Sequence, residues 1–220
     1  MPFPVQKFVI FVFIGYSLGS LYETGYAQAD SIIVRKRSWP YCNQQAHWGK
    51  KLLRAEIISF TLQAGGYLAL ALMPPESTHW HVRPVRENYK RAFTRPPVWD
   101  NDVWQYNYLG HPITGSIHYN ILRSQDVPAF YAFLYSTAQS VIWEYLWEAS
   151  QERPSIQDLL FTSTIGSVVG ECMHVSTIAL KRNRFTVFEK ILVTLINPAY
   201  VINNGYKKTS EKHIWWKNYH

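Results

Sequence analysis

Apolar residues recur along most of the chain at the three- and four-residue spacing of a helix, and strict alternation of apolar and polar positions is scarce. Prolines and short polar connections separate the periodic segments. The pattern predicts an all-α fold, a compact bundle of five or six helices without internal repeats. The predicted helices cover residues 52–73, 85–93, 107–125, 128–152, 155–182 and 185–196.

Local signals define the start and the packing face of one of these helices. Ser155 and Asp158 form the pattern S-x-x-D ahead of an apolar run, which predicts a capping box. Gly166 and Gly170 are four residues apart, and small residues at this spacing let a neighbouring helix come close. Because the connection that begins at Ser150 is short, we expect the helices on either side of it to be antiparallel neighbours.

The first 29 residues have the layout of a secretory signal peptide. Lys7 supplies a positive charge, residues 8–15 form the apolar run, and the sequence AQA at 27–29 is a cleavage site of small residues. We expect residues 30–220 to form a single helical domain in the periplasm or the outer envelope membrane of a bacterium. An N-terminal anchor that stays uncleaved is the alternative.

The two cysteines, Cys42 and Cys172, are too few and too far apart in the chain to indicate a disulfide scaffold. A single disulfide between them stays open. Because Cys172 lies in an apolar helical run, we favour a buried free thiol there.

The net charge of +7, from 22 Lys and Arg against 15 Asp and Glu, raises the question of an anionic partner. An exported protein seldom meets nucleic acid, so we expect no nucleic-acid partner and favour anionic membrane lipid. Nine Trp and 15 Tyr support a membrane boundary, where both residues are enriched. Two predicted helices are long enough to span a membrane, but both are rich in polar residues. We therefore predict a domain that is membrane-associated or partly embedded; a merely basic soluble surface is the alternative.

Polar side chains follow one line on each of two predicted helices. The first line consists of Ser136, Ser140, Glu144 and Glu148, and the second consists of Ser163, Ser167, Glu171 and His174. If the two helices are antiparallel, the lines face each other and make a buried polar seam.

This arrangement fixes the depth of each acid in the seam. We expect Glu148 to be nearer to Asp158 than Glu144 is, and Glu144 to approach residues 163–166. Glu171 and His174 then lie opposite Ser136 and Gln139. The groups of such a seam cannot all be charged, so at least one Glu is expected to be protonated or paired.

Three interpretations of the seam stay open. Glu171 and His174 have the E-x-x-H spacing of metal–carboxylate bundles, to which Glu144, Glu148 and either His111 or His118 would add ligands. The second interpretation is a metal-free acid/base pair with a Glu of raised pKa. The third, which we favour, is a set of hydrogen bonds that fixes helix register. The chain has no phosphate-binding loop, dinucleotide fingerprint or C-x-x-C pair, so metal content and cofactors are unassigned.

His111 precedes Pro112, and a proline disfavours helical backbone at the residue before it. We therefore expect His111 at the entrance of a helix, where an imidazole can accept or pass on protons near neutral pH. The alternative is that it caps the helix or stacks on Tyr108.

Short motifs in a fixed order carry a family resemblance. They are Trp99-Asp100, Asn107-Tyr108, Gly110-His111-Pro112, Trp143-Glu144-Tyr145, Glu148, Pro154-Ser155, Asp158, Gly166, Gly170-Glu171 and Asn197-Pro198. Over about residues 99–200 the chain resembles a bacterial family of exported proteins classified as a domain of unknown function. Residues 148–170 are more faintly similar to VanZ-like membrane proteins, from which the exported N-terminus departs.

The resemblance implies a site and no known reaction. The site that it implies is built from His111, Glu144, Glu148, Asp158 and Glu171. Our catalytic candidates are His111, Glu144, Glu148 and Glu171. The supporting candidates are Asn107, Ser140, Ser155, Asp158, Gly166, Gly170 and His174.

Two functions are compatible with these observations, and whether the protein is an enzyme stays open. We favour an envelope protein of unknown biochemical activity that acts as a membrane-associated binding or scaffold protein. The alternative is a hydrolase-type enzyme that acts on a lipid or lipid-linked envelope substrate.

Overall fold

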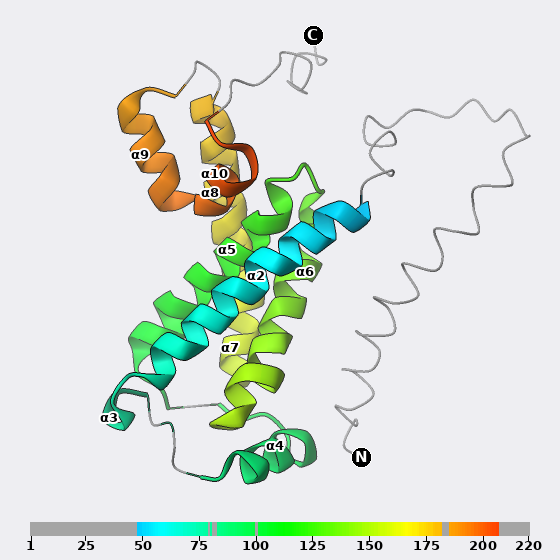
Figure 1. Cartoon of the computed structure of the whole chain (residues 1–220), viewed down its shortest axis with the longest axis vertical. Helices are drawn as coiled ribbons and strands as arrows, with labels where there is room; N and C mark the ends of the chain where they lie inside the picture. Colours follow the sequence, from blue (N-terminus) through cyan, green and yellow to red (C-terminus); the bar gives the residue numbers. More distant parts are fainter. Residues whose placement is uncertain (1–47, 79, 81–82, 100, 182–184, 207–220) are drawn as a thin grey trace, which may run out of the picture.

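The computed structural model describes residues 48–78, 80, 83–99, 101–181 and 185–206 (Figure 1). The predicted signal peptide and Cys42 lie outside these residues, as do two groups of consecutive basic residues, Arg35-Lys36-Arg37 and Lys207-Lys208. The described part is all-helical; its only β-type pairing is an isolated parallel bridge between Val98 and Ser155. The predicted all-α fold is confirmed, whereas membrane association or partial embedding stays a prediction.

The helices begin and end close to the predicted boundaries, with two short additions, α3 and α10. The predicted helix over 155–182 is divided into α7, a π-helical turn and α8. The elements are α2 (Trp48–Ala71), α3 (Pro75–Thr78), α4 (Val85–Thr94), η3 (Tyr106–Gly110), α5 (His111–Arg123), α6 (Ala129–Ile142), η4 (Trp143–Trp147), η5 (Glu148–Ser150), α7 (Ile156–Leu160), η6 (Phe161–Ile165), α8 (Gly166–Lys181), α9 (Val187–Ile196) and α10 (Pro198–Asn204).

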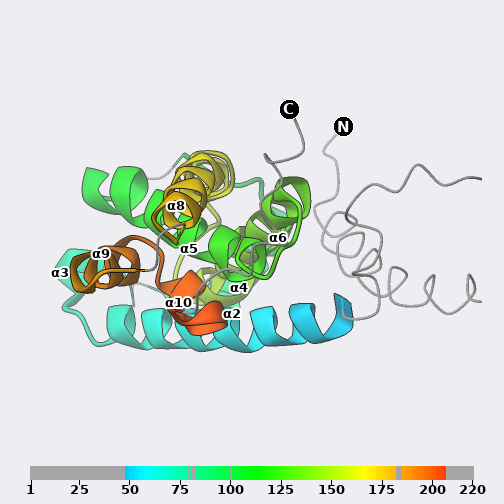
Figure 2. The same cartoon turned by 90° about the horizontal axis from the view of Figure 1, so that it is seen from above.

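Helix α5 is the centre of the bundle. It packs against α8 and α6, and the long α2 lies across the side opposite α8 (Figures 1 and 2). Ile121 and Leu122 of α5 are buried together with Ala55 of α2, Tyr135 of α6 and Ala199 of α10. The helices α9 and α10 lie at one end of the molecule, and α3 and α4 lie at the other (Figure 1).

Glycines let α5 and the segment from η6 to α8 approach each other closely. A Cβ atom on Gly115 would lie 2.0 Å from the carbonyl oxygen of Thr162, and one on Gly166 would lie 2.8 Å from Cα of Gly115. A Cβ on Gly170 would lie 2.8 Å from the ring of Tyr119. The close approach predicted for Gly166 and Gly170 is confirmed, and the helix that comes close is α5.

The seam predicted along the whole length of two antiparallel helices does not form. Both α6 and α8 pack chiefly on α5, and α6 meets the stretch from α7 to α8 mainly at η6. A short connection makes two helices neighbours where they join, but the glycines of α5 and α8 draw those two helices together further along.

Three π-helical turns in the described residues lie beside predicted site residues. The turn η3 ends at the residue before His111, η4 contains Glu144, and η6 begins three residues after Asp158. A π turn holds an extra residue, so the residues after it are rotated by roughly 100° relative to an uninterrupted α-helix. Such turns are frequent at functional sites.

Two further expectations concern the outer surface. Among the described helices, none is both long and apolar enough to cross a membrane. Cys172 is exposed on α8, so the expectation of a buried thiol is wrong. The reason is that α8 buries the face that carries Gly170 and His174 instead.

Candidate functional site

An open cavity of about 340 Å³ is lined chiefly by α2, the segment from η3 to α5, and α6. Much of its wall is apolar or aromatic and includes Leu62, Leu70, Ile117 and Trp143. The polar residues of the wall include Gln63, Asp102, His111, His118, Gln139, Ser140, Glu148 and Thr162. This is the size and lining of a small-molecule site.

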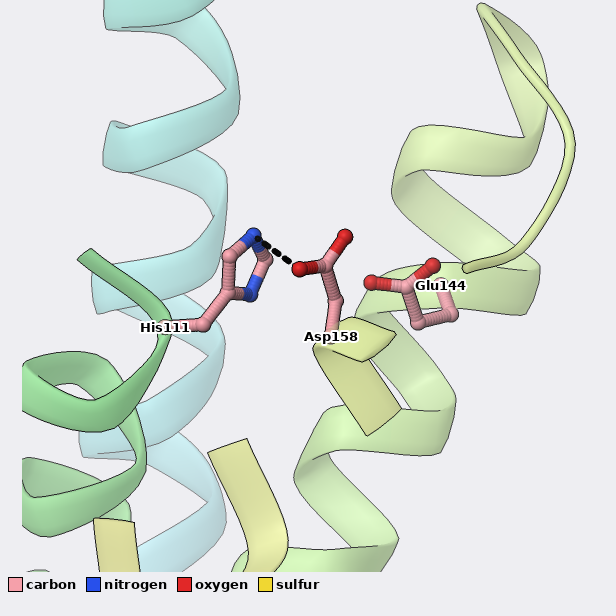
Figure 3. A group of neighbouring side chains, drawn as sticks. All are labelled: His111, Glu144 and Asp158. Carbon is pink, nitrogen blue, oxygen red and sulfur yellow. Dashed lines mark ion pairs between the residues drawn. The ribbon is translucent and has the colours of Figure 1, made fainter. Parts of the chain in front are cut away.

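Three side chains from three elements meet beside this cavity (Figure 3). His111 begins α5, Glu144 lies in η4 and Asp158 lies in α7. His111 Nε2 is 3.4 Å from Asp158 Oδ1, and one ligand atom from each of the three residues lies within 4.8 Å of the others. Glu144 and Asp158 are only 1% and 3% exposed. We call this group the His111 cluster; an imidazole and two carboxylates are groups that ligate metal ions.

The predicted capping box is half formed, and this places the two carboxylates. Ser155 Oγ accepts the N–H of Asp158 at 3.2 Å, as expected for the N-cap of α7. In a full box the Asp158 carboxylate would accept the N–H of Ser155. Glu144 Oε2 accepts that N–H instead, at 2.8 Å. The carboxylate of Asp158 therefore faces the imidazole of His111.

The backbone of His111 is helical, with φ −61° and ψ −47°, although Pro112 follows. His111 is the first residue of α5, as expected, but the expectation of non-helical backbone there is wrong, because η3 runs directly into α5. The ring is positioned by a tertiary contact: its Nδ1 lies 3.1 Å from Thr162 Oγ1. Thr162 follows Asp158 by four residues, so these two partners of the imidazole come from one helical stretch.

Glu144 and Glu148 are both buried. Burial raises the pKa of Glu144 well above its ordinary value, and the charge of Asp158 raises it further, against hydrogen bonds from Ser155 and Glu148. Burial and the charge of Glu144 likewise raise the pKa of Glu148. Glu148 Oε2 accepts the indole N–H of Trp143 at 2.7 Å. Two adjacent acids in this setting do not both ionise readily near neutral pH.

The order of the two glutamates differs from the prediction. Glu144, and not Glu148, groups with Asp158. The π turn η4 begins one residue before Glu144 and rotates Glu148 away from the line of its predecessors, so that Glu148 lines the cavity.

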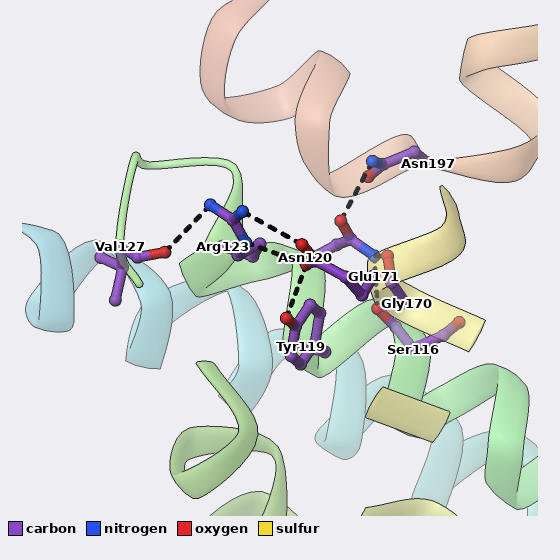
Figure 4. A network of polar contacts seen from close by, with 8 residues as sticks. All are labelled: Ser116, Tyr119, Asn120, Arg123, Val127, Gly170, Glu171 and Asn197. Atoms are coloured by element: carbon purple, nitrogen blue, oxygen red, sulfur yellow. Dashed lines mark hydrogen bonds and ion pairs between the residues drawn. The ribbon is translucent and has the colours of Figure 1, made fainter. Parts of the chain in front are cut away.

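Glu171 belongs to a different group of contacts (Figure 4). Its Oε2 accepts hydrogen bonds from Tyr119 at 2.6 Å and Arg123 Nε at 2.9 Å, and Arg123 Nη2 reaches Oε1 at 3.1 Å. We call these three residues the Glu171 cluster. Burial acts to raise the pKa of Glu171, but the hydrogen bonds from Arg123 and Tyr119 outweigh it and hold the pKa below its ordinary value.

The predicted position of Glu171 and His174 opposite α6 is therefore wrong. Ser136 donates to the carbonyl of Gly115 on α5, and Gln139 contacts Gln63 and Glu56 of α2. His174 is buried, and burial together with Arg123 lowers its pKa to about 4. The E-x-x-H pair lies apart from the His111 cluster because η6 and α8 follow α5.

Of the remaining candidates, some are packed in the interior and others line the cavity. Asn107 is buried in η3, and Ser140 is buried and lines the cavity. His118 Nδ1 lies 3.0 Å from Ser59 Oγ, and burial lowers the pKa of His118 to about 4. Sequence reasoning missed Thr162 and Trp143. The four-residue spacing from Asp158 to Thr162 and the W-E-Y motif itself were the available signals.

Comparison with known proteins gives one family match, and it covers the part of the chain that contains the site. Residues 96–199 match a protein family described as "Domain of unknown function (DUF3943)". The matched part of the chain runs from ten residues before η3 to the second residue of α10, and it contains the whole His111 cluster and the whole Glu171 cluster. The predicted family class is confirmed, whereas a bacterial origin and a similarity to VanZ-like proteins stay predictions. No curated protein and no solved structure matches the chain.

Proposed function

We propose that the protein is a membrane-associated binding protein of a bacterial envelope, exported by means of residues 1–29. The observation that carries the proposal is the distribution of side chains between inside and outside. Among the described residues, polar and charged side chains outnumber apolar ones at buried positions, while many large apolar side chains are exposed. A water-soluble monomer seldom exposes large apolar patches.

The exposed apolar residues form stripes at helical spacing. On α2 the stripe consists of Leu53, Ile57, Phe60 and Leu68, and Leu72 continues it directly after the helix. On α9 it consists of Val187, Phe188, Ile191 and Leu195. Lys50 and Arg54 lie at the start of the α2 stripe, where they can contact anionic headgroups. Apolar stripes flanked by basic residues are typical of helices that lie in a membrane interface.

Flotation of the purified protein with vesicles of anionic and zwitterionic phospholipid tests this proposal. We expect Ile57→Ser, Phe60→Ser and Leu68→Ser together to lower membrane partitioning at least about tenfold, because three apolar side chains leave the lipid. Trp99→Ser with Val103→Ser, two exposed positions outside α2 and α9, is the matched control. High salt should release part of the protein. Absence of wild-type flotation, or an equal loss in both variants, would reject lipid contact through α2.

A second candidate function is hydrolysis of a lipid or lipid-linked substrate. It is favoured by the position of His111 and Glu148 in the cavity wall, because a buried acid with a raised pKa can act as a general acid. Glu148→Gln should then lower the turnover of an ester or phosphoester lipid by about 10²-fold or more. If the wild-type protein hydrolyses none of a panel of such lipids, this candidate is rejected and the binding function is unaffected.

A further inference from the structure

The spacing within the His111 cluster is that of ligands around a metal ion. Two ligand atoms that each lie about 2.1 Å from a tetrahedral ion are about 3.4 Å apart. His111 Nε2 and Asp158 Oδ1 are 3.4 Å apart. A hydrogen bond between an imidazolium and a carboxylate is shorter, about 2.7–2.9 Å. The observed distance fits two ligands with an ion between them better than a direct charged hydrogen bond.

The third side chain supplies an independent indication. Glu144 is 1% exposed, and its Oε1 accepts no hydrogen bond from an N–H or hydroxyl group of the described residues. The neighbouring carboxyl of Glu148 can donate to Glu144 only while it carries a proton. A buried carboxylate oxygen without a permanent donor is costly, and a cation at the cluster would satisfy it.

The surroundings hold the ligands as in known metal sites. A ligating histidine usually donates its second ring nitrogen to a nearby oxygen, which fixes the tautomer. His111 Nδ1 lies 3.1 Å from Thr162 Oγ1, so the other ring nitrogen, Nε2, faces Asp158. The Ser155 N–H in turn fixes Oε2 of Glu144. Both supports therefore involve the segment 155–162, which accepts the hydrogen bond from His111 at one end and donates one to Glu144 at the other.

We propose that His111, Glu144 and Asp158 bind one divalent transition-metal ion of the zinc, manganese or iron(II) class. One imidazole and two carboxylates suit these ions, whereas Ca²⁺ and Mg²⁺ favour sites with oxygen ligands alone. Three protein ligands leave a coordination position for water or a ligand. Because His111 also lines the cavity, the ion lies at the wall of that cavity.

Metal titration of the full-length, chelator-treated protein tests this assignment. Zn²⁺ is titrated against a fluorescent indicator, and metal retained after gel filtration is measured by mass spectrometry. We expect one Zn²⁺ per chain in the wild-type protein, and affinity at least tenfold lower in Glu144→Gln and in Asp158→Asn. Thr162→Val, which removes only the support of the imidazole, should lower affinity about ten- to 100-fold.

The matched control is Glu171→Gln, which changes a carboxylate in the second cluster, beside His174, without touching the first. It should bind Zn²⁺ as the wild type does. Circular dichroism establishes that each variant is folded. Zn²⁺ binding by the wild type that persists unchanged in both Glu144→Gln and Thr162→Val, loss of binding in Glu171→Gln alone, or no retained metal in the wild type would each overturn the assignment.

Discussion

The Glu171 cluster and the His111 cluster both include residues of α5, but they surround their glutamates with opposite environments. Glu171 accepts three hydrogen bonds from Arg123 and Tyr119, its side chain is 35% exposed, and its pKa is lowered. Glu144 is almost fully buried, accepts one backbone N–H, and its pKa is raised. Both acids lie within residues 96–199, the part of the chain that matches the family.

The difference indicates that Glu171 stabilises the fold, whereas Glu144 is placed to bind a ligand. A carboxylate with a bidentate Arg partner gains from ionisation in the folded state. A buried carboxylate beside a second acid loses by ionisation unless a proton or metal ion compensates it. Structural acids do not require such compensation from outside the chain, so the His111 cluster is the better candidate for function.

The largest expected effect comes from Gly115, which lies where α5 meets η6 beside the His111 cluster. Gly115→Ala should destabilise the fold by about 3 kcal/mol, because the new Cβ would lie 2.0 Å from a backbone carbonyl oxygen that cannot easily move. Urea unfolding measures the change. Gly65→Ala is the control: it has open space around it in α2 and should be neutral or stabilising by about 0.5–1 kcal/mol.

The comparison itself predicts opposite signs for two matched substitutions in the metal-free protein. Glu171→Gln should lower the free energy of unfolding by about 1 kcal/mol, a value reduced by the exposure of the pair with Arg123. Glu144→Gln should leave it unchanged or raise it by about 1 kcal/mol, because the amide oxygen can still accept the Ser155 N–H.

Chemical denaturation at neutral pH with chelator present measures both values. Equal destabilisation by the two substitutions would contradict the distinction between the clusters, since Glu144 would then be stabilised by ionisation as Glu171 is.

A smaller effect is expected in the pH dependence of stability. The raised pKa of Glu144 means that its contribution is present below pH 4.5, the ordinary Glu value, and is lost as pH rises through the folded-state pKa. The lowered pKa of Glu171 means that its contribution is present above pH 4.5 and is lost as pH falls through the folded-state pKa. In unfolding curves from pH 4 to 8, the free energy of unfolding of Glu144→Gln should therefore rise relative to that of the wild type as pH rises. The stability that Glu171→Gln loses relative to the wild type should become smaller only below pH 4.5. The reverse pattern would mean that Glu171, and not Glu144, is the acid with the raised pKa.

The helices and the N-cap of α7 could be predicted from the sequence because they depend on local patterns. The polar line from Ser136 to Glu148 and the N-cap at Ser155 are examples, and all of these side chains are buried as expected. The partners of the site residues depend on tertiary geometry. The π turn η4 changes which glutamate faces Asp158, and residue spacing in the sequence does not predict where a π turn forms.

The error about Glu171 has a similar origin. Four-residue spacing places Glu171 on a line with Ser167, but it does not say which helix that line faces. The close approach at Gly115 and Gly166 puts α8 against α5, where Tyr119 and Arg123 are the available donors. Sequence reasoning from connection length favoured α6 instead.

Our central claim is that the adjacent buried carboxyls of Glu144 and Glu148 keep a proton near neutral pH when no metal is bound. Infrared spectroscopy of the metal-free, full-length protein at pH 7 tests it directly, because a protonated carboxyl has a C=O stretching band that a carboxylate lacks. We predict such a band in the wild-type protein and in Glu171→Gln, and its loss in the double variant Glu144→Gln, Glu148→Gln. Absence of the band in the wild-type protein, or its loss in Glu171→Gln, would contradict the claim.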